Sequence, residues 1–260
     1  MTNESLTLFI PLYGKALMSR EGFLPDPAAE EIVRTVDFDF TKVDRSRKLA
    51  IYMAMRARFF DMVARNFAKV QPDSPIIQLG VGLDSRVRRV PCGNPWFDLD
   101  FPEVVDLRRT FFPEDARYHL IGAPALPADW IAQLPDGAPG AVVLMEGLSM
   151  YLSRQDMRDL LTALSRKYDD VLVVFDAYSH TAAKLSALKN PVNAVKARID
   201  FAMDDPQELA GDLPGWSWEA FDIIRPEEIE RLKGPDRLRF RFMGRFGRSF
   251  YRIFACRFVK

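Results

Sequence analysis

Short apolar runs alternate with amphipathic stretches from about residue 75 onward. The runs predict strands over residues 76–80, 96–100, 117–122, 141–146 and 171–176. The stretches between them predict helices over residues 85–89, 102–112, 128–134 and 153–168, and a helical stretch after the last strand through residue 203. This alternation predicts an α/β fold, a mostly parallel sheet with helices on both faces.

The region before residue 75 has the pattern of three helices, over residues 4–20, 27–36 and 44–70. Two residues mark the start of the second helix: Asp26 is a good N-cap, and Pro27 is tolerated at the first helical position. In the third helix, Arg56 lies on an apolar stripe with Met53 and Phe60. A buried arginine needs an acceptor, so Arg56 either forms a structural ion pair or clamps a ligand carboxylate. Arg58, on a weaker parallel stripe, is the competing candidate.

The last third of the chain has a different pattern. Residues 206–214 predict a loop or short helix, residues 216–224 a strand, and Arg225 the start of a helix. A final strand is expected over residues 250–258, inserted antiparallel at the sheet edge. We expect one domain over residues 1–260, with a helical cap (1–72), a cofactor-binding core (73–180) and a substrate-side part with the last strands (181–260).

Composition restricts the function classes. The chain has 260 residues, of which 48% are hydrophobic, and its formal net charge is zero. No bias toward nucleic acid or anionic membrane follows, and we expect the basic segment from Arg237 to Phe242 to be a solvated amphipathic face. We find no signal peptide and no apolar run of membrane-spanning length. Cys92 and Cys256 offer neither metal-ligand spacing nor a disulfide framework. We therefore expect a cytoplasmic protein without a metal, monomeric or homodimeric.

A glycine-bearing turn follows the first predicted strand. Gly80 and Gly82 allow a backbone to approach a ligand closely, and the helix start after them favours negative charge. Asp100 ends the second strand, twenty residues beyond Gly80, where nucleotide-binding folds place an acid for ribose hydroxyls. Nicotinamide-binding sequences share this arrangement but carry a third glycine, where this chain has Ser85. A nicotinamide oxidoreductase is thus less favoured but remains open.

Three blocks resemble the leucine carboxyl methyltransferase family, and more closely its bacterial polyketide O-methyltransferase branch. They are QLGVGLDSR (78–86), DLDFPEV (98–104) and MEGLSMYL (145–152). PLYGKA (11–16), RARFFD (56–61), Trp130 and VFD (174–176) extend the resemblance, which covers most of residues 8–180. Three blocks in the right order are far more specific than any one alone.

The resemblance implies a Rossmann-like class I S-adenosylmethionine-dependent methyltransferase with seven strands, the last inserted antiparallel. It implies that Gly80 and Gly82 lie against the methionine part of the cofactor and that Asp100 holds the ribose. It further implies that Arg56 pairs with the methionine carboxylate and that Glu146 faces the amino group.

One departure concerns the adenine. The family has an acid shortly after the third strand, where this chain has Pro127. Backbone groups of Ala125 and Leu126, or Asp129, would then have to contact the adenine.

Three side chains are candidates for the acceptor side. Tyr151 follows the fourth strand, Lys15 could attract an anionic acceptor, and His180 is the candidate imidazole base, since His119 lies inside a strand. Each has a simpler structural or surface interpretation. A carboxylate acceptor needs no base, whereas a phenol benefits from one. We expect an O-methyltransferase acting on a carboxylate or hydroxyl of a small polyketide-like or aromatic metabolite. A protein carboxyl methyltransferase and a catalytically silent cofactor-binding protein remain alternatives.

Overall fold

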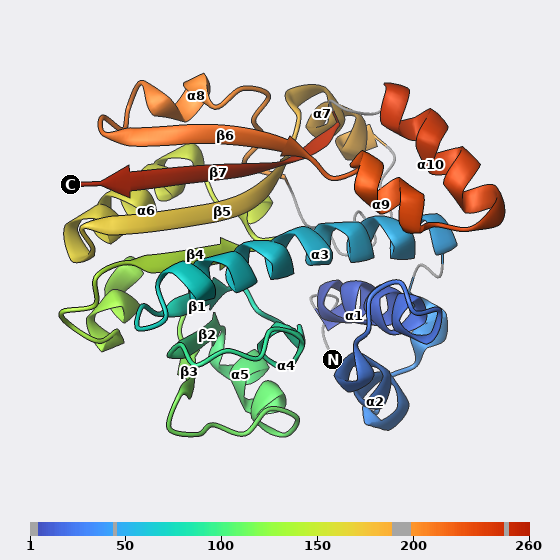
Figure 1. The fold of residues 1–260 in the computed structure, drawn as a ribbon, viewed down its shortest axis with the longest axis horizontal. Helices are drawn as coiled ribbons and strands as arrows, with labels where there is room; N and C mark the ends of the chain where they lie inside the picture. The colour runs from blue at the N-terminus through green and yellow to red at the C-terminus, as the bar shows by residue number, and fades with distance from the viewer. Residues whose placement is uncertain (1–4, 44–45, 189–198, 247–249) are drawn as a thin grey trace.

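A computed structural model describes residues 5–43, 46–188, 199–246 and 250–260. Its centre is one seven-stranded sheet in the order β3-β2-β1-β4-β5-β7-β6 (Figure 1). Strands β1 to β5 are parallel to one another, and β7 lies between β5 and β6, antiparallel to both. The predicted α/β fold is thus confirmed, including the late antiparallel strand, although β7 is inserted one strand inside the edge.

The strands are β1 (Ile76–Leu79), β2 (Trp96–Asp100), β3 (Tyr118–Gly122), β4 (Ala141–Met145), β5 (Asp170–Tyr178), β6 (Trp216–Asp222) and β7 (Tyr251–Val259). The α-helices are α1 (Ser5–Arg20), α2 (Pro27–Thr35), α3 (Arg47–Val70), α4 (Arg86–Arg89), α5 (Pro102–Arg109), α6 (Arg154–Lys167), α7 (His180–Leu188), α8 (Gln207–Ala210), α9 (Pro226–Arg231) and α10 (Gly234–Phe246). Three short 3₁₀ helices are η1 (Phe40–Lys42), η2 (Ala128–Gln133) and η3 (Ser149–Tyr151).

The sheet separates two apolar cores. On one face, the long helix α3 crosses the strands, and α1 and α2 pack beside it beyond the carboxyl ends of the parallel strands (Figure 1); Phe9, Phe60 and Ile76 belong to this core. On the other face, α6 and η2 cover β1, β4 and β5, with Leu160 and Trp130 among the buried residues. All residues of β1, β2 and β4 are buried, as expected for parallel strands that are covered on both faces.

Two predicted helix starts are confirmed by their caps. The side chain of Asp26 accepts a hydrogen bond from the Ala29 N–H, and Ser153 forms a capping box with Asp156 at the start of α6. The predicted start of the third helix at Asp44 lies outside the described residues, which place Ser46 as the N-cap of α3.

Two predicted helices differ in the structure. The segment expected to be helical over residues 128–134 is the 3₁₀ helix η2, which follows the cis peptide bond between Leu126 and Pro127. The helix expected through residue 203 ends at Leu188 as described, residues 189–198 lie outside the description, and residues 199–203 are not helical. There, Ala202 bridges to Tyr178 and the Met203 N–H donates to the Tyr178 carbonyl, so sheet pairing replaces the helix.

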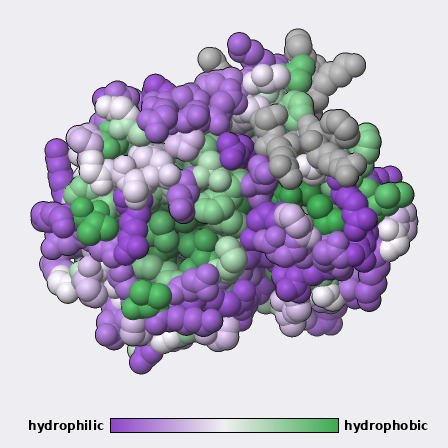
Figure 2. Space-filling model, turned by 45° about the horizontal axis from the view of Figure 1, so that its top comes forward, coloured by the Kyte–Doolittle hydropathy of each residue, from purple (hydrophilic) through white to green (hydrophobic). Residues whose placement is uncertain are grey.

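Hydrophilic side chains dominate most of the surface in Figure 2, and hydrophobic ones gather in its left half. This area corresponds to β5, β7 and β6, where Figure 1 shows no helix over the near face. Leu172, Phe221 and Ala255 are accordingly only half-buried. Within the part of the chain that the structure describes, no helix is long and apolar enough to cross a membrane.

Candidate active site

The glycine turn joins β1 to α4 at the carboxyl edge of the sheet. Gly80 and Gly82 have φ angles of +63° and +53°, a region that side chains disfavour. A Cβ on Gly80 would lie 3.0 Å from the Leu148 side chain, and one on Gly82 would lie 3.1 Å from that of Leu8. The Gly82 N–H donates to Asp100 Oδ2 at 2.7 Å. The structure therefore brings together the two glycines and the acid that the sequence pointed to.

Asp100 is nearly buried at the end of β2, with 9% exposure. Burial raises the pKa of this carboxyl, although the N–H groups of Gly82 and Phe101 favour its charged form. A carboxylate has about four lone-pair sites, so both oxygens retain capacity for ligand hydroxyls. The next side chain, Phe101, is 54% exposed and offers an aromatic surface beside Asp100.

A buried arginine from α5 braces the same turn. Arg108 Nη1 donates to the carbonyl oxygens of Gly82 at 3.1 Å and Asp84 at 2.7 Å. Its Nη2 lies 2.5 Å from Asp98 Oδ2, and its Nε donates to the Tyr118 hydroxyl at 2.8 Å. Tyr118 in turn donates to Asp98 at 2.7 Å. The backbone of the turn is thus fixed by side chains of β2, β3 and α5.

An ion network closes the opposite side of the turn. Lys15 Nζ pairs with Asp84 and lies 3.2 Å from Glu146 Oε1, which is also 3.2 Å from Arg56 Nε. Arg86 binds the other oxygen of Glu146. Burial opposes ionisation of Glu146, but Lys15, Arg56 and Arg86 lower its pKa to about 2. Burial likewise acts against Asp84, yet surrounding cations hold its pKa well below the ordinary value. Both carboxylates are therefore ionised at neutral pH.

A second set of charges lies behind this network and supports α4. Arg89 contacts Asp26 at 2.6 Å, Asp61 at 2.9 Å and Asp84 at 3.1 Å. Asp61 also accepts from Arg86 Nε at 2.8 Å. The N-cap of α2 and the middle of α3 are thus tied to the short helix that follows the glycine turn.

Asp176, at the end of β5, joins Arg56 to the loop after β4. Its carboxylate accepts from the Gly147 N–H at 2.7 Å and from Arg56 Nη1 at 2.8 Å. The Tyr251 hydroxyl donates to the same carboxylate at 2.6 Å. Arg56 therefore forms ion pairs with Glu146 and Asp176, the first of the two alternatives, and its role toward a ligand carboxylate stays a prediction. The competing Arg58 instead contacts Glu228 at 2.7 Å.

Tyr151 lies beyond the end of β4, and Tyr178 is the last residue of β5. Tyr151 is 39% exposed in η3, and Tyr178 is half-buried. Partial burial raises the pKa of both phenols, and the charges of Arg56 and Asp176 act on both. Tyr151 thus lies close enough to the Arg56–Asp176 pair to sense its field, whereas its role toward an acceptor stays a prediction.

Neither histidine joins this cluster. His180 begins α7, its side chain is half exposed, and Nε2 lies 2.7 Å from Glu208 Oε2. Asp204 completes a group of metal-capable side chains within 4.8 Å of one another, where Arg154, 3.6 Å from Glu208, already supplies a positive charge. His119 packs its ring on Phe97 with centroids 4.8 Å apart.

The loop after β3 contains the predicted adenine contacts. The Ala125 carbonyl accepts from the Trp130 indole N–H at 3.0 Å, and the peptide bond between Leu126 and Pro127 is cis. Asp129 is exposed on η2. The backbone N–H groups of Ala125 and Leu126 face no acceptor in the described parts of the chain, so both stay candidates for a ligand.

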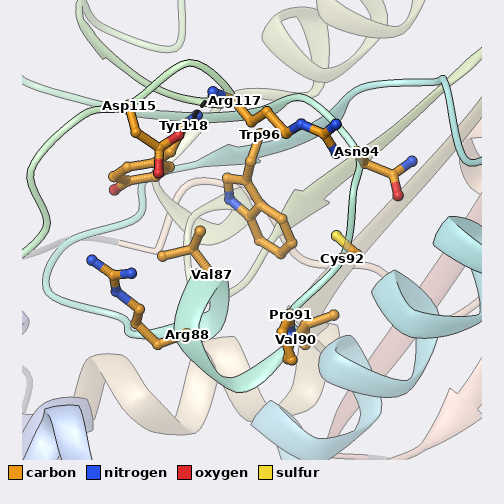
Figure 3. Close-up of a pocket in the computed structure, with 10 residues that line it drawn as sticks. All are labelled: Val87, Arg88, Val90, Pro91, Cys92, Asn94, Trp96, Asp115, Arg117 and Tyr118. Atoms are coloured by element: carbon orange, nitrogen blue, oxygen red, sulfur yellow. Dashed lines mark hydrogen bonds between the residues drawn. The ribbon is translucent and has the colours of Figure 1, made fainter.

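A shallow pocket of about 210 Å³ lies elsewhere, at the amino ends of β2 and β3. Figure 3 shows it between the outer side of α4 and the strands, with Trp96, Cys92 and Arg88 among the side chains around it. Ligands of doubly wound sheets bind at the carboxyl ends of the strands. This pocket is therefore separate from the crevice that Asp100 and Glu146 define.

The sequence did not point to several groups that build the site. Asp84, Arg86, Arg89 and Arg108 were not recognised, because a charged residue in a loop or short helix normally indicates solvent exposure. Tyr251 was missed as well, since it lies beyond the segment of resemblance. A signal was present in α4, where Arg86, Arg88 and Arg89 occupy three of the four positions of about one helical turn and so cannot all face solvent.

Comparisons with known proteins identify the family of this chain. A model of the leucine carboxyl methyltransferase family matches residues 12–165. Tetracenomycin polyketide synthesis O-methyltransferase TcmP of Streptomyces glaucescens is 33% identical over 219 residues, covering 83% of this chain and 81% of TcmP. The S-adenosyl-L-methionine-dependent methyltransferase dpfgK of Gibberella zeae is 29% identical over 240 residues, covering 83% and 80%.

Solved structures share the fold. A DUF574 family protein from Streptomyces avermitilis has a TM-score of 0.61 at 10% identity and covers 90% of both chains. The plantazolicin methyltransferase BpumL, solved with a desmethyl analogue and SAH, has a TM-score of 0.52 at 10% identity and covers 98% of this chain and 99% of BpumL. The chain belongs to the leucine carboxyl methyltransferase family and is an S-adenosylmethionine-dependent methyltransferase.

Proposed function

We propose that the protein transfers the methyl group of S-adenosylmethionine to an acceptor oxygen that is already ionised, a carboxylate of a small polyketide-like or aromatic metabolite. One observation carries the choice of a carboxylate. The chain has two histidines; His119 is stacked on Phe97 and His180 is engaged by Glu208. An ordinary phenol, with a pKa near 10, would need a base that neither histidine supplies from these positions.

The crevice fits the cofactor at both ends. At the ribose end, Asp100 keeps lone pairs for two hydroxyls. At the amino-acid end, Glu146 provides a carboxylate for the ammonium, and Arg56 provides donors for the carboxylate. Arg86 Nη1 is buried and has no partner among the described residues. An unsatisfied buried donor costs about 1–3 kcal/mol, and a ligand carboxylate next to Glu146 would satisfy it.

The bound cofactor supplies an activated methyl group, so the protein has to align and desolvate the acceptor. Tyr151 and Tyr178 are suited to this task. Because burial raises the pKa of both phenols, they stay protonated at neutral pH and donate hydrogen bonds. Donors orient an anionic oxygen but cannot remove a proton from a neutral one. We assign Tyr151 to the acceptor side on this ground.

The remaining candidates take supporting roles in this proposal. Lys15 is buried against Asp84 and Glu146, so it contributes positive potential at the methionine end, from which an anionic acceptor also benefits. His180, which is engaged by Glu208, has no role in the chemistry in this proposal. The exposed ring of Phe101 and the free N–H groups of Ala125 and Leu126 would hold the adenine in place of the missing acid.

Cofactor binding is the first test. Isothermal titration with S-adenosylmethionine should show a single site, and Asp100→Ala and Arg56→Ala should each weaken binding at least tenfold, about 1.4 kcal/mol. Arg58→Ala is the matched control, because Arg58 lies on the same helix but contacts Glu228. No binding at millimolar cofactor, or unchanged affinity in both site variants, would reject the proposal.

The acceptor is tested with matched pairs of aromatic carboxylic acids and the corresponding phenols. We expect transfer to the acids, with kcat/KM nearly constant between pH 6 and 8, and little effect of His180→Ala. Transfer to phenols only, with an activity that His180→Ala abolishes, would contradict the carboxylate assignment. Cofactor binding without transfer to any acid or phenol of a broad panel would instead support a silent binding protein.

A further inference from the structure

Tyr251 reaches the cofactor crevice from a part of the chain that the family match does not include. It is the first residue of β7, and the antiparallel register pairs it with Tyr178, while Ile253 is paired with Asp176. Alternate residues of a strand share one face, so the Tyr251 side chain lies on the α3 face and reaches Asp176 diagonally. The hydroxyl is buried and donates to Asp176 Oδ2 at 2.6 Å.

Asp176 connects Tyr251 to two parts of the site. Its Oδ1 accepts a hydrogen bond from the Gly147 N–H, and its Oδ2 accepts hydrogen bonds from Arg56 Nη1 and the Tyr251 hydroxyl. Gly147 directly follows Glu146. Arg56 Nη1 also donates to the Tyr251 hydroxyl oxygen at 3.2 Å. One carboxylate therefore sets both the arginine and the glutamate-bearing loop, and Tyr251 is its only side-chain hydroxyl donor among the described residues.

We propose that Tyr251 is a positioning residue for cofactor binding: its hydroxyl orients Asp176, and Asp176 in turn fixes Arg56 and the loop that carries Glu146. This inference deepens the proposed function and rests on it. Tyr251 does not touch the reacting atoms in this assignment; it orients Asp176 and also accepts a hydrogen bond from Arg56 Nη1. The C-terminal strand thereby becomes part of the cofactor site.

The groups around Asp176 determine how its pKa responds to the loss of the Tyr251 hydroxyl. They come from α3, the loop after β4, η3, β5 and β7: Tyr52, Arg56, Glu146, Tyr151, Tyr178 and Tyr251. Burial raises the pKa of Asp176, whereas Arg56 and the Tyr251 hydrogen bond lower it. Without the hydroxyl, Asp176 is protonated at a higher pH than in the wild type. Its contacts with Arg56 and Gly147 then weaken as the pH falls and recover as it rises.

The test measures the dissociation constant of S-adenosylhomocysteine from pH 8 down to the lowest pH at which both proteins stay folded, at constant ionic strength. Tyr251→Phe should bind within threefold of wild type at pH 8. Its affinity relative to wild type should fall progressively as the pH is lowered, because Asp176 loses its charge earlier in the variant. Tyr52→Phe is the matched control, because its hydroxyl lies near Asp176 but donates to the Tyr251 backbone carbonyl, at 3.3 Å, and not to the Asp176 carboxylate. It should follow the wild-type curve.

A Tyr251→Phe curve that parallels the wild type, with or without a constant offset, would overturn the positioning role, because a purely structural effect does not depend on the protonation of Asp176. No binding by the wild type would overturn the proposed function itself. If Tyr251→Phe does not fold, Asp176→Asn decides: binding weakened tenfold or more at every pH supports the inference, and wild-type binding refutes it.

Discussion

Replacing Arg108 with methionine should separate the stability of the fold from the organisation of the glycine turn. Arg108 is completely buried and neutralises Asp98, to which it lies 2.5 Å away. Methionine fills a similar volume without charge, so it leaves the Asp98 carboxylate buried with only the hydrogen bonds from Tyr118 and Trp96. Breaking a buried pair in this way typically costs about 3–5 kcal/mol.

The size of the effect can be worked out for the double variant. Asp98→Asn removes the uncompensated charge, so Asp98→Asn/Arg108→Met should regain at least about 2 kcal/mol relative to Arg108→Met. Recovery should be incomplete, because the carbonyl groups of Gly82 and Asp84 still lack their donor, at about 1 kcal/mol or more each. The turn itself is thus no better ordered in the double variant than in the single one.

Chemical denaturation and cofactor titration measure the two effects on the same samples. Unfolding free energies should rank wild type above the double variant and the double variant above Arg108→Met. Affinity for S-adenosylmethionine should fall at least tenfold in both variants. If the double variant is no more stable than the single one, the pairing of Asp98 is not what Arg108 supplies. If the double variant binds the cofactor like the wild type, the brace does not organise the turn.

Three further predictions follow from single contacts. Gly82→Ala should destabilise the fold by about 1–2 kcal/mol through its positive φ and also weaken cofactor binding, since its Cβ would meet Leu8 at 3.1 Å. Gly22→Ala, also at positive φ but with no neighbour within 4 Å, should lose stability without losing cofactor affinity. Equal cofactor affinities of the two variants would refute this. Phe101→Ala should raise the dissociation constant for S-adenosylmethionine several-fold without changing the melting temperature, because the ring is exposed; an unchanged constant would exclude an adenine contact. Stability should fall as the pH drops from about 4.5 to about 2. Burial opposes ionisation of Glu146, but Lys15, Arg56 and Arg86 depress its pKa to about 2, so at a pH above its ordinary pKa its ionised form stabilises the fold by roughly 3 kcal/mol. Glu146→Gln should show a shallower acid transition in unfolding experiments.

The sequence predicted the core of the fold well because its signals are local. Buried parallel strands are short runs of mostly apolar residues, so β1, β2 and β4 could be located to within one or two residues. Asp26 and Ser153 cap helices with their own side chains, which is again a short-range effect. The segment after β5 could not be predicted in this way, since the bridge from Ala202 to Tyr178 depends on a partner more than twenty residues away.

The candidate site was predictable to the extent that a residue contradicts its local pattern. Arg56 was identified because a charge on an apolar stripe demands a partner, and the structure supplies Glu146 and Asp176. Lys15 and Asp84 contradict nothing locally. They are 69 residues apart, and only the packing of α1 against the glycine turn makes them a buried pair. Partners of this kind cannot be derived from composition or periodicity.

The same reasoning explains why the least predictable residue of the site comes from the last strand. The insertion of β7 between β5 and β6 is decided by the whole sheet, and it determines which residue of the C-terminal segment faces Asp176. A shift of one residue in this register would turn Tyr251 to the opposite face. The completion of the sheet and the alignment of Arg56 therefore depend on the same pairing. In the proposed assignment, a methyl donor at the carboxyl edge is held by a site that is complete only when β7 has been added.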